Sequence, residues 1–97
     1  MRTLELTVVN KSGLHARPAN LFVESAARFM SRITVENLDR GSRPVDAKSI
    51  LMLLTVGVQC GHRIRLTADG DDEEAALASL GALAEAGLGE GTEADQA

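Results

Sequence analysis

Aromatic residues are almost absent from this chain of 97 residues, which contains two phenylalanines and no tryptophan or tyrosine. Its 10 basic residues are outnumbered by 14 acidic ones, so the net charge is −4 at pH 7. A module that binds nucleic acid usually presents a basic surface and aromatic side chains on which bases stack. We therefore expect no nucleic-acid partner.

Cysteine and long apolar runs are scarce as well. Cys60 is the only cysteine, so neither an intrachain disulfide nor a multi-cysteine zinc cluster can form. The chain has no run of about 18 apolar residues that could cross a membrane, and residues 1–5 lack the apolar stretch of a signal peptide. These absences predict a single cytoplasmic domain without membrane insertion, resident metal or cofactor.

The first thirty residues predict a strand followed by a helix. Residues 4–8 alternate in polarity, as a half-buried strand does. From Ala19 to Phe29, apolar residues recur every three or four positions, which predicts an amphipathic helix. Proline is tolerated in a first helical turn but not in a helix interior, so Pro18 places the start of this helix around residues 15–17.

Two more strands are expected in the next segment. Residues 33–37 alternate in polarity and predict a second strand, which turn-forming residues follow. Residues 42–45 include Pro44, which has no backbone N–H to donate to a neighbouring strand. That segment therefore predicts a short strand at the edge of the sheet.

A short helix is expected after the edge strand. Asp46 can cap this helix, which would continue to Leu54 and end at Gly57. A buried strand over residues 50–58 fits the apolar run as well, because periodicity does not separate the two for so short a segment. The preceding cap signal favours the helix.

The remaining residues predict a strand, a helix and a tail. Residues 64–68 alternate in polarity, and Asp71 with Glu74 resembles the capping box that begins a helix. A leucine stripe then continues to about Gly87, and residues 89–97 read as a flexible acidic tail. Helices should cover one face of a mostly antiparallel sheet. The order of the strands stays open, with a ferredoxin-like arrangement as one alternative.

The segment 13–18 combines features suited to a phosphate group. Gly13 permits a tight turn, and the N–H groups that begin a helix favour an anion. Arg17 offers a forked cation, and His15 offers an imidazole, a nucleophile that can carry a covalent intermediate. Charge supports this placement, because residues 1–48 carry a net charge of +3 and residues 49–97 a net charge of −7. A surface histidine at a helix cap is the simpler reading of these residues alone.

The heptapeptide Gly-Leu-His-Ala-Arg-Pro-Ala at residues 13–19 resembles the active-site signature of the HPr family of phosphocarriers. Residues 46–58 and 61–72 are also similar to that family, and the resemblance covers residues 1–88. It implies an α+β fold of the open-faced β-sandwich type with element order βαββαβα. The four-stranded antiparallel sheet would have the strand order 1-4-2-3, with three helices on one face.

The resemblance also implies a function in the bacterial phosphoenolpyruvate-dependent sugar phosphotransferase system. His15 would accept a phosphoryl group on its Nδ1 atom from phospho-Enzyme I and pass it to the EIIA domain of a sugar permease. Arg17 would stabilise the phosphoryl charge, and Ser12 with the amides of Ala16 and Arg17 would help to hold the group. Such a protein is a phosphoryl carrier rather than a stand-alone enzyme.

Ser49 matches the serine that HPr kinase/phosphorylase modifies in many Gram-positive members of the family, which implies a regulatory site. Met52 stands where those members commonly have glycine, which argues against recognition by the kinase. The apolar residues around Ile50 and Leu51 cannot all face inward on so short a helix, so some should form a docking patch for partners, with Lys48 at its rim.

Two alternatives to the sugar system remain. The chain could be a paralogue that serves a nitrogen-type or dihydroxyacetone-type phosphotransfer chain through the same His15. It could also be a regulatory binding module, although the intact pair of His15 and Arg17 argues against a role in binding alone. We expect a monomer in each case.

Overall fold

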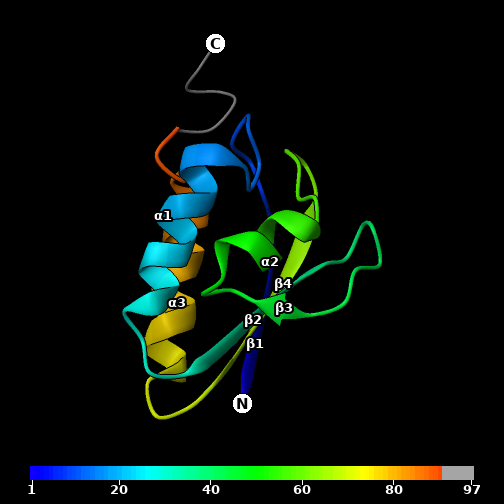
Figure 1. Ribbon diagram of the computed structural model, residues 1–97. Helices are drawn as coiled ribbons and strands as arrows, with labels where there is room; N and C mark the ends of the chain where they lie inside the picture. Colours follow the sequence, from blue (N-terminus) through cyan, green and yellow to red (C-terminus); the bar gives the residue numbers. More distant parts are fainter. Residues whose placement is uncertain (91–97) are drawn as a thin grey trace.

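Residues 1–90 of the computed structural model form a four-stranded sheet with three helices on one face (Figure 1). The elements follow the predicted order: β1 (Arg2–Thr7), α1 (Ala16–Ala27), β2 (Arg32–Asn37), β3 (Val45–Asp46), α2 (Ile50–Thr55), β4 (Arg63–Asp69) and α3 (Glu73–Glu85). None of these helices is long and apolar enough to span a lipid bilayer.

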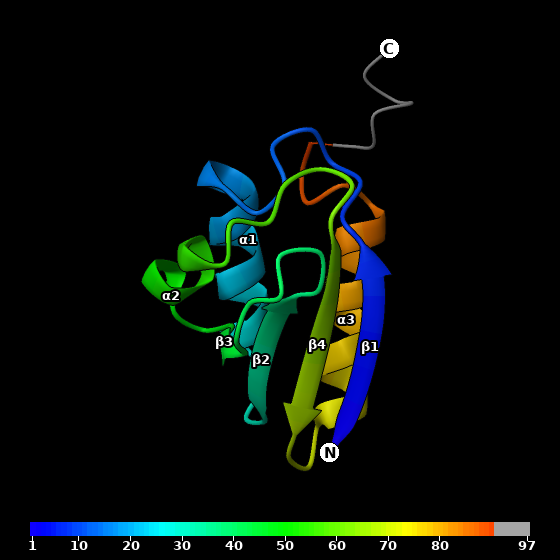
Figure 2. The ribbon, with the colours of Figure 1, turned by 90° about the vertical axis from the view of Figure 1, so that its right-hand side faces the viewer.

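The strands lie in the order β1-β4-β2-β3, and every neighbouring pair is antiparallel. Leu66 of the central strand β4 lies opposite Leu4 of β1 on one side and Val35 of β2 on the other. This order confirms the open-faced α+β fold and excludes the ferredoxin-like alternative. Figure 2 shows the sheet nearest the viewer, with α1 and α3 behind it.

The core lies between the sheet and the helices. Alternate residues of β2 and β4 point inward, and Phe22 of α1 and Leu80 of α3 meet them from the helical layer. The core side chains without exposed surface include Phe22, Ile33, Val35, Ile64, Leu66 and Leu80. The predicted periodicities of strand and helix are confirmed here, because both follow from the burial of one face of each element.

The outer face of the sheet carries charged residues that pair across the strands. Arg65 of β4 donates to the carboxylate of Glu5 in β1 at 3.1 Å and lies 3.5 Å from that of Glu36 in β2. These two carboxylates hold the pKa of Arg65 above its ordinary value, with the hydrogen bond to Glu5 as the largest cause. The uncovered face is therefore polar, as expected for an antiparallel sheet with one face packed on a core.

The edge strand is shorter and later than predicted. The prediction of a strand over residues 42–45 is wrong except at its last residue, because β3 comprises only Val45 and Asp46. Val45 pairs with Val35, and Asp46 pairs with Thr34. Pro44 stands just outside the strand, where its missing N–H costs no ladder hydrogen bond.

The short helix α2 is confirmed, and the alternative strand over residues 50–58 is excluded. Its cap, however, is Ser49 rather than Asp46, because the Ser49 Oγ accepts a hydrogen bond from the Met52 N–H at 3.3 Å. Asp46 instead accepts from the N–H of Lys48 at 2.9 Å and turns the chain between β3 and α2. Gly57 follows the helix with a φ of 58°, a left-handed conformation that suits glycine and ends a helix as predicted.

The start of α3 also differs from the prediction. The helix begins at Glu73, and the expected capping box of Asp71 and Glu74 is wrong. The Glu73 carboxylate reaches back to the N–H of Gly70 at 3.1 Å. The carboxylate of Asp72 accepts hydrogen bonds from the N–H groups of Met30 and Ser31 and from the Ser31 hydroxyl. It thereby joins the start of α3 to the loop after α1.

The predicted tail over residues 89–97 lies mostly outside the described residues, since the described part of the chain ends at Glu90. Gly89 and Glu90 continue directly from a hydrogen-bonded turn after α3. In this turn the Leu88 N–H donates to the Leu83 carbonyl and the Gly87 N–H donates to the Ala84 carbonyl. This is the Schellman pattern that satisfies the last carbonyls of a helix.

Asp72→Asn should lower the stability of the fold most strongly above about pH 3.8, the ordinary pKa of the carboxyl. Hydrogen bonds from Ser31 and Met30 hold the pKa of Asp72 below that value, so the ionised form stabilises the folded state and its contribution is lost as the pH falls through the folded-state pKa. The thermal midpoint, measured from neutral pH downwards, should therefore differ less between variant and wild type in acid. Asp71→Asn is the matched control, and an equal effect of both variants would contradict the role of Asp72.

Candidate phosphoryl-acceptor site

The loop between β1 and α1 is held against the loop that follows α2. Leu14 donates its N–H to the carbonyl of Val58 at 3.0 Å, and its side chain is buried. Gly13 has a φ of 61°, and a Cβ atom at this position would lie 2.3 Å from the same carbonyl oxygen. Only glycine fits so close an approach in this conformation, so the Gly13–Leu14 segment fixes where the next residue stands.

His15 is the N-cap residue of α1. Its backbone is extended, with a φ of −132° and a ψ of 160°, and its side chain makes no capping hydrogen bond. The ring is half-buried and accepts or donates no hydrogen bond within residues 1–90. A nitrogen of this imidazole is therefore available to a reacting group at the start of the helix.

Ala16 and Arg17 follow His15 in the first turn of α1 and are exposed. Ala16 has a φ of 50°, a left-handed conformation that costs an alanine roughly 1–2 kcal/mol. The N–H groups of Ala16 and Arg17 have no acceptor within residues 1–90. Pro18 supplies no N–H but lies buried and fixes the backbone of this first turn, which directly follows His15.

Ser12 is engaged by a carboxylate from the far end of the chain. The Glu90 Oε2 accepts a hydrogen bond from the Ser12 hydroxyl at 2.7 Å, and Glu90 Oε1 accepts from the Ser12 N–H at 3.0 Å. The side-chain amide of Asn10 also donates to Glu90 at 3.0 Å. These hydrogen bonds, with the one from Asn10 as the largest cause, hold the pKa of Glu90 below its ordinary value.

The helix α2 packs against α1. Its last residues lead to Val58, which bonds to Leu14 next to His15. Its first residues lie at the other end of α1, where the Lys48 Nζ donates to the carbonyl of Phe29 at 2.6 Å. Since α1 has 12 residues, about 18 Å of helix separates its two ends. Lys48 and Ser49 therefore lie away from His15.

The apolar residues of α2 divide between core and surface. Leu53 is fully buried, whereas Leu51 is 72% exposed and Ile50 is 37% exposed. Met52 and Leu54 are also exposed, so α2 carries four apolar side chains that the core does not cover. This group of four residues (Ile50, Leu51, Met52 and Leu54) is called the α2 surface below.

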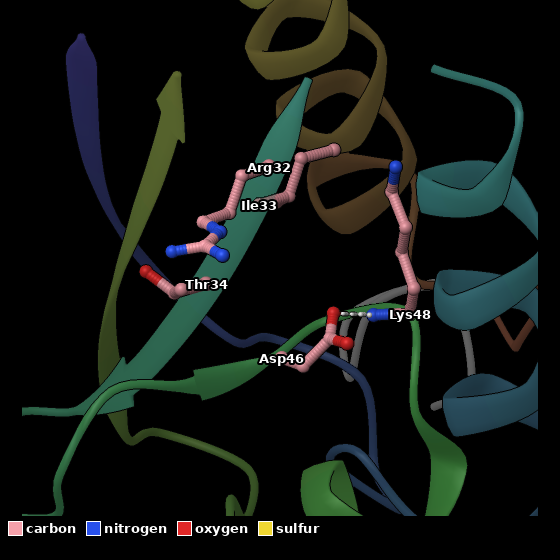
Figure 3. Close-up of a pocket in the computed structure, with 5 residues that line it drawn as sticks. All are labelled: Arg32, Ile33, Thr34, Asp46 and Lys48. Atoms are coloured by element: carbon pink, nitrogen blue, oxygen red, sulfur yellow. Dashed lines mark hydrogen bonds between the residues drawn. The ribbon is translucent and has the colours of Figure 1, made fainter. Parts of the chain in front are cut away.

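A pocket of about 370 Å³ opens beside β2 and β3 and does not include the histidine (Figure 3). It is lined by Arg32, Ile33, Thr34, Asp46 and Lys48. Lys48 already donates its backbone N–H to Asp46 and its Nζ to the carbonyl of Phe29. Its polar groups therefore hold the connection between β3 and α2. No three His, Cys, Asp or Glu side chains of residues 1–90 come together as metal ligands.

Two contributors to the site were missed by the reading of the sequence. Glu90 fell in the expected tail, and the only signal for its placement is the pattern of Gly87, Leu88 and Gly89, which is typical of a turn with a buried apolar anchor. His62 was assigned no role, but its Nδ1 accepts from the N–H of Gln59 at 3.1 Å and so orders the loop behind the site.

Comparison with known families agrees with this geometry. The family model described as the PTS HPr component phosphorylation site matches residues 3–86. The chain belongs to the HPr family. The other comparisons give the same result, since the HPr phosphocarrier of Treponema pallidum is 42% identical over 73 residues, which cover 75% of this chain and 80% of that protein.

The relatives of this chain also include proteins that are much longer than it is. The multiphosphoryl transfer protein of Salmonella typhimurium is 46% identical over 87 residues, or 90% of this chain. The chain spans only 23% of the length of that relative. A crystal structure of HPr from Thermoanaerobacter tengcongensis is 44% identical, covers 93% of this chain and 98% of its own, and gives a TM-score of 0.86.

Gly13→Ala should destabilise this HPr domain far more than Gly41→Ala. Both glycines have a φ near 60°, but a Cβ at Gly41 meets nothing within 4 Å. The control should cost about 1 kcal/mol for the backbone conformation alone, and Gly13→Ala about 2 kcal/mol more because the loops must separate. Urea unfolding measures both values, and equal losses would show that the contact with Val58 contributes nothing.

Proposed function

We propose that the protein is a phosphoryl carrier in which His15 accepts the group from phospho-Enzyme I and passes it to an EIIA domain of a sugar permease. Membership of the HPr family supports this function, and the observation that carries it is the unengaged imidazole at the start of α1 beside Arg17. The cell compartment would be the cytoplasm, and the working form a monomer.

The transfer follows from the chemistry of an imidazole at a helix start. The lone pair of the His15 Nδ1 attacks phosphorus as the bond between phosphorus and the donor atom of Enzyme I breaks. The electron pair of the broken bond stays on the donor, and the ring proton that His15 gives up balances the proton that the donor takes up. Transfer to the EIIA domain is the same exchange with His15 as the donor.

The residues around His15 would supply charge and position. Phosphoryl transfer needs stabilisation of charge on three oxygens more than it needs acid–base chemistry. The Arg17 guanidinium is exposed and able to bind two of these oxygens, and the N–H groups of Ala16 and Arg17 have no acceptor within residues 1–90. Ser12 would contribute its N–H and hydroxyl once they are not occupied by Glu90.

Partner proteins would dock on the α2 surface. Its apolar side chains lie on the outside of the fold, and the Val58–Leu14 hydrogen bond connects the end of α2 to the site. Leu51 is the most exposed of them, at 72%, and is the residue we assign to the centre of the contact. Lys48 would act at the rim only through its stem, because its amine is bound to Phe29.

A regulatory role remains the second candidate. A relative named HPr-like protein Crh, from Bacillus subtilis, is 44% identical over 72 residues, and a solved structure of that protein is titled a catabolite repression protein. Ser49 would then be a target of HPr kinase/phosphorylase. Its hydroxyl already accepts from Met52 at the start of α2, where an added phosphate would be tolerated.

Incubation with phosphoenolpyruvate, Mg²⁺ and Enzyme I should add one phosphoryl group to the protein, and His15→Ala should remove this acceptance completely. Intact mass measures the product, and the group should be lost in mild acid because a phosphorus–nitrogen bond is labile there. His62→Gln is the matched control, since it removes the other histidine and keeps a side chain that can accept a hydrogen bond from the Gln59 N–H. A phosphorylated His15→Ala variant, or an unphosphorylated wild type with its own active Enzyme I, would contradict the carrier function.

Leu51→Glu should raise the KM for this protein as a substrate of Enzyme I by about fivefold to tenfold and leave kcat nearly unchanged. The side chain is on the surface, so the thermal midpoint should not fall. Met30→Glu is the control, because Met30 is 91% exposed but lies at the opposite end of α1 from His15. Equal effects of both substitutions on KM would show that docking does not use the α2 surface.

A further inference from the structure

Glu90 holds the donors of Ser12 in a geometry that resembles the binding of a phosphate. One carboxylate oxygen takes the Ser12 hydroxyl and the other takes its backbone N–H, at 2.7 and 3.0 Å. Asn10, which is fully buried, donates its side-chain amide to Glu90 and to the carbonyl of Gly13. Three donors of the loop before His15 are therefore directed at one anionic group.

The position of Glu90 is fixed by the turn that precedes it. Gly87, Leu88 and Gly89 all have a positive φ, of 90°, 51° and 84°. The chain consequently reverses, the side chain of Leu88 enters the core, and the Glu90 N–H donates to the carbonyl of Gly87 at 2.9 Å. An ordered backbone of this kind presents the carboxylate to Ser12 instead of leaving it in solvent.

The carboxylate remains ionised under ordinary conditions. Hydrogen bonds from Asn10 and Ser12, together with the charge of Lys11, keep the pKa of Glu90 lowered. A phosphoryl group carries close to two negative charges at neutral pH. If both anions were bound near Ser12, they would repel each other and compete for the same donors.

We propose that Glu90 is an internal anion that occupies the Ser12 donors in the unphosphorylated protein and is displaced when His15 carries the phosphoryl group. This inference rests on the proposed carrier function. Glu90 does not touch the reacting atoms, so it is a positioning residue that acts through Ser12. Glu90 stabilises the unphosphorylated form and not the phosphorylated one. It therefore makes the free energy of transferring the phosphoryl group away from His15 more favourable.

The test compares Glu90→Gln with Glu85→Gln. Glu85 is exposed at the end of α3, and its replacement removes the same charge without touching Ser12. At fixed ratios of phosphoenolpyruvate to pyruvate with Enzyme I, the equilibrium constant for phosphorylation should rise about threefold to tenfold in Glu90→Gln, the scale of a screened like-charge interaction. It should stay within twofold of wild type in Glu85→Gln. Equal constants for the two variants would overturn the inference.

The effect should also depend on Ser12. In a Ser12→Ala background, the gain from Glu90→Gln should fall to less than half, because one of the contested donors is gone. If the full gain persisted there, Glu90 would not act through Ser12.

A spectroscopic measurement separates displacement from a merely structural role. The pKa of Glu90, followed by NMR, should be low in the unphosphorylated protein and return towards its ordinary value in the phosphorylated one. A pKa that stays low after phosphorylation would overturn the inference while leaving the carrier function intact. Failure of wild type and both variants to accept any phosphoryl group from their own active Enzyme I would instead refute the carrier function.

Discussion

The close approach of Gly13 to the Val58 carbonyl is the constraint on which the arrangement of the site depends. The loop before α1 and the loop after α2 share this contact, the Leu14–Val58 hydrogen bond and the pairing of Val8 with Gly61 and His62. Together these contacts fix where α1 begins relative to the sheet, and hence the position of His15. A side chain at position 13 would separate the loops, so the identity of one residue in the signature has a steric cause independent of catalysis.

Much of the fold could be predicted from local pattern, because each strand and helix buries one face. Pro18 placed the start of α1 within one residue, and Gly57 placed the end of α2, since both residues restrict the backbone directly. The strand order could not be obtained in this way. It followed only from the resemblance to HPr, because alternation within a strand does not specify its neighbours.

The errors in predicting the contacts of polar side chains share a physical cause. Each such side chain could bond to several partners, and the local sequence does not show which of them it bonds to in the folded chain. Asp46 and Glu90 were read from their neighbours in the chain, and Asp72 was given no separate role. Asp72 instead binds Met30 and Ser31, about forty residues away, and Glu90 binds Ser12, 78 residues away. Such contacts depend on the finished packing of α1 against α3. The proposed phosphoryl acceptor, His15, could be predicted because the residues that form its proposed site are its neighbours in the chain as well as in space.

The antiparallel helices α1 and α3 are fastened differently at their two ends. Figure 1 shows them side by side, with the start of α1 and the end of α3 at the same end of the molecule. At the other end Asp72 binds two backbone N–H groups and a hydroxyl within a short connection. Near His15 the link passes through Glu90, which lies five residues beyond the end of α3 and accepts three hydrogen bonds from Asn10 and Ser12. A carboxylate therefore closes each end of the helix pair, and local opening at either end should first require that its three hydrogen bonds break.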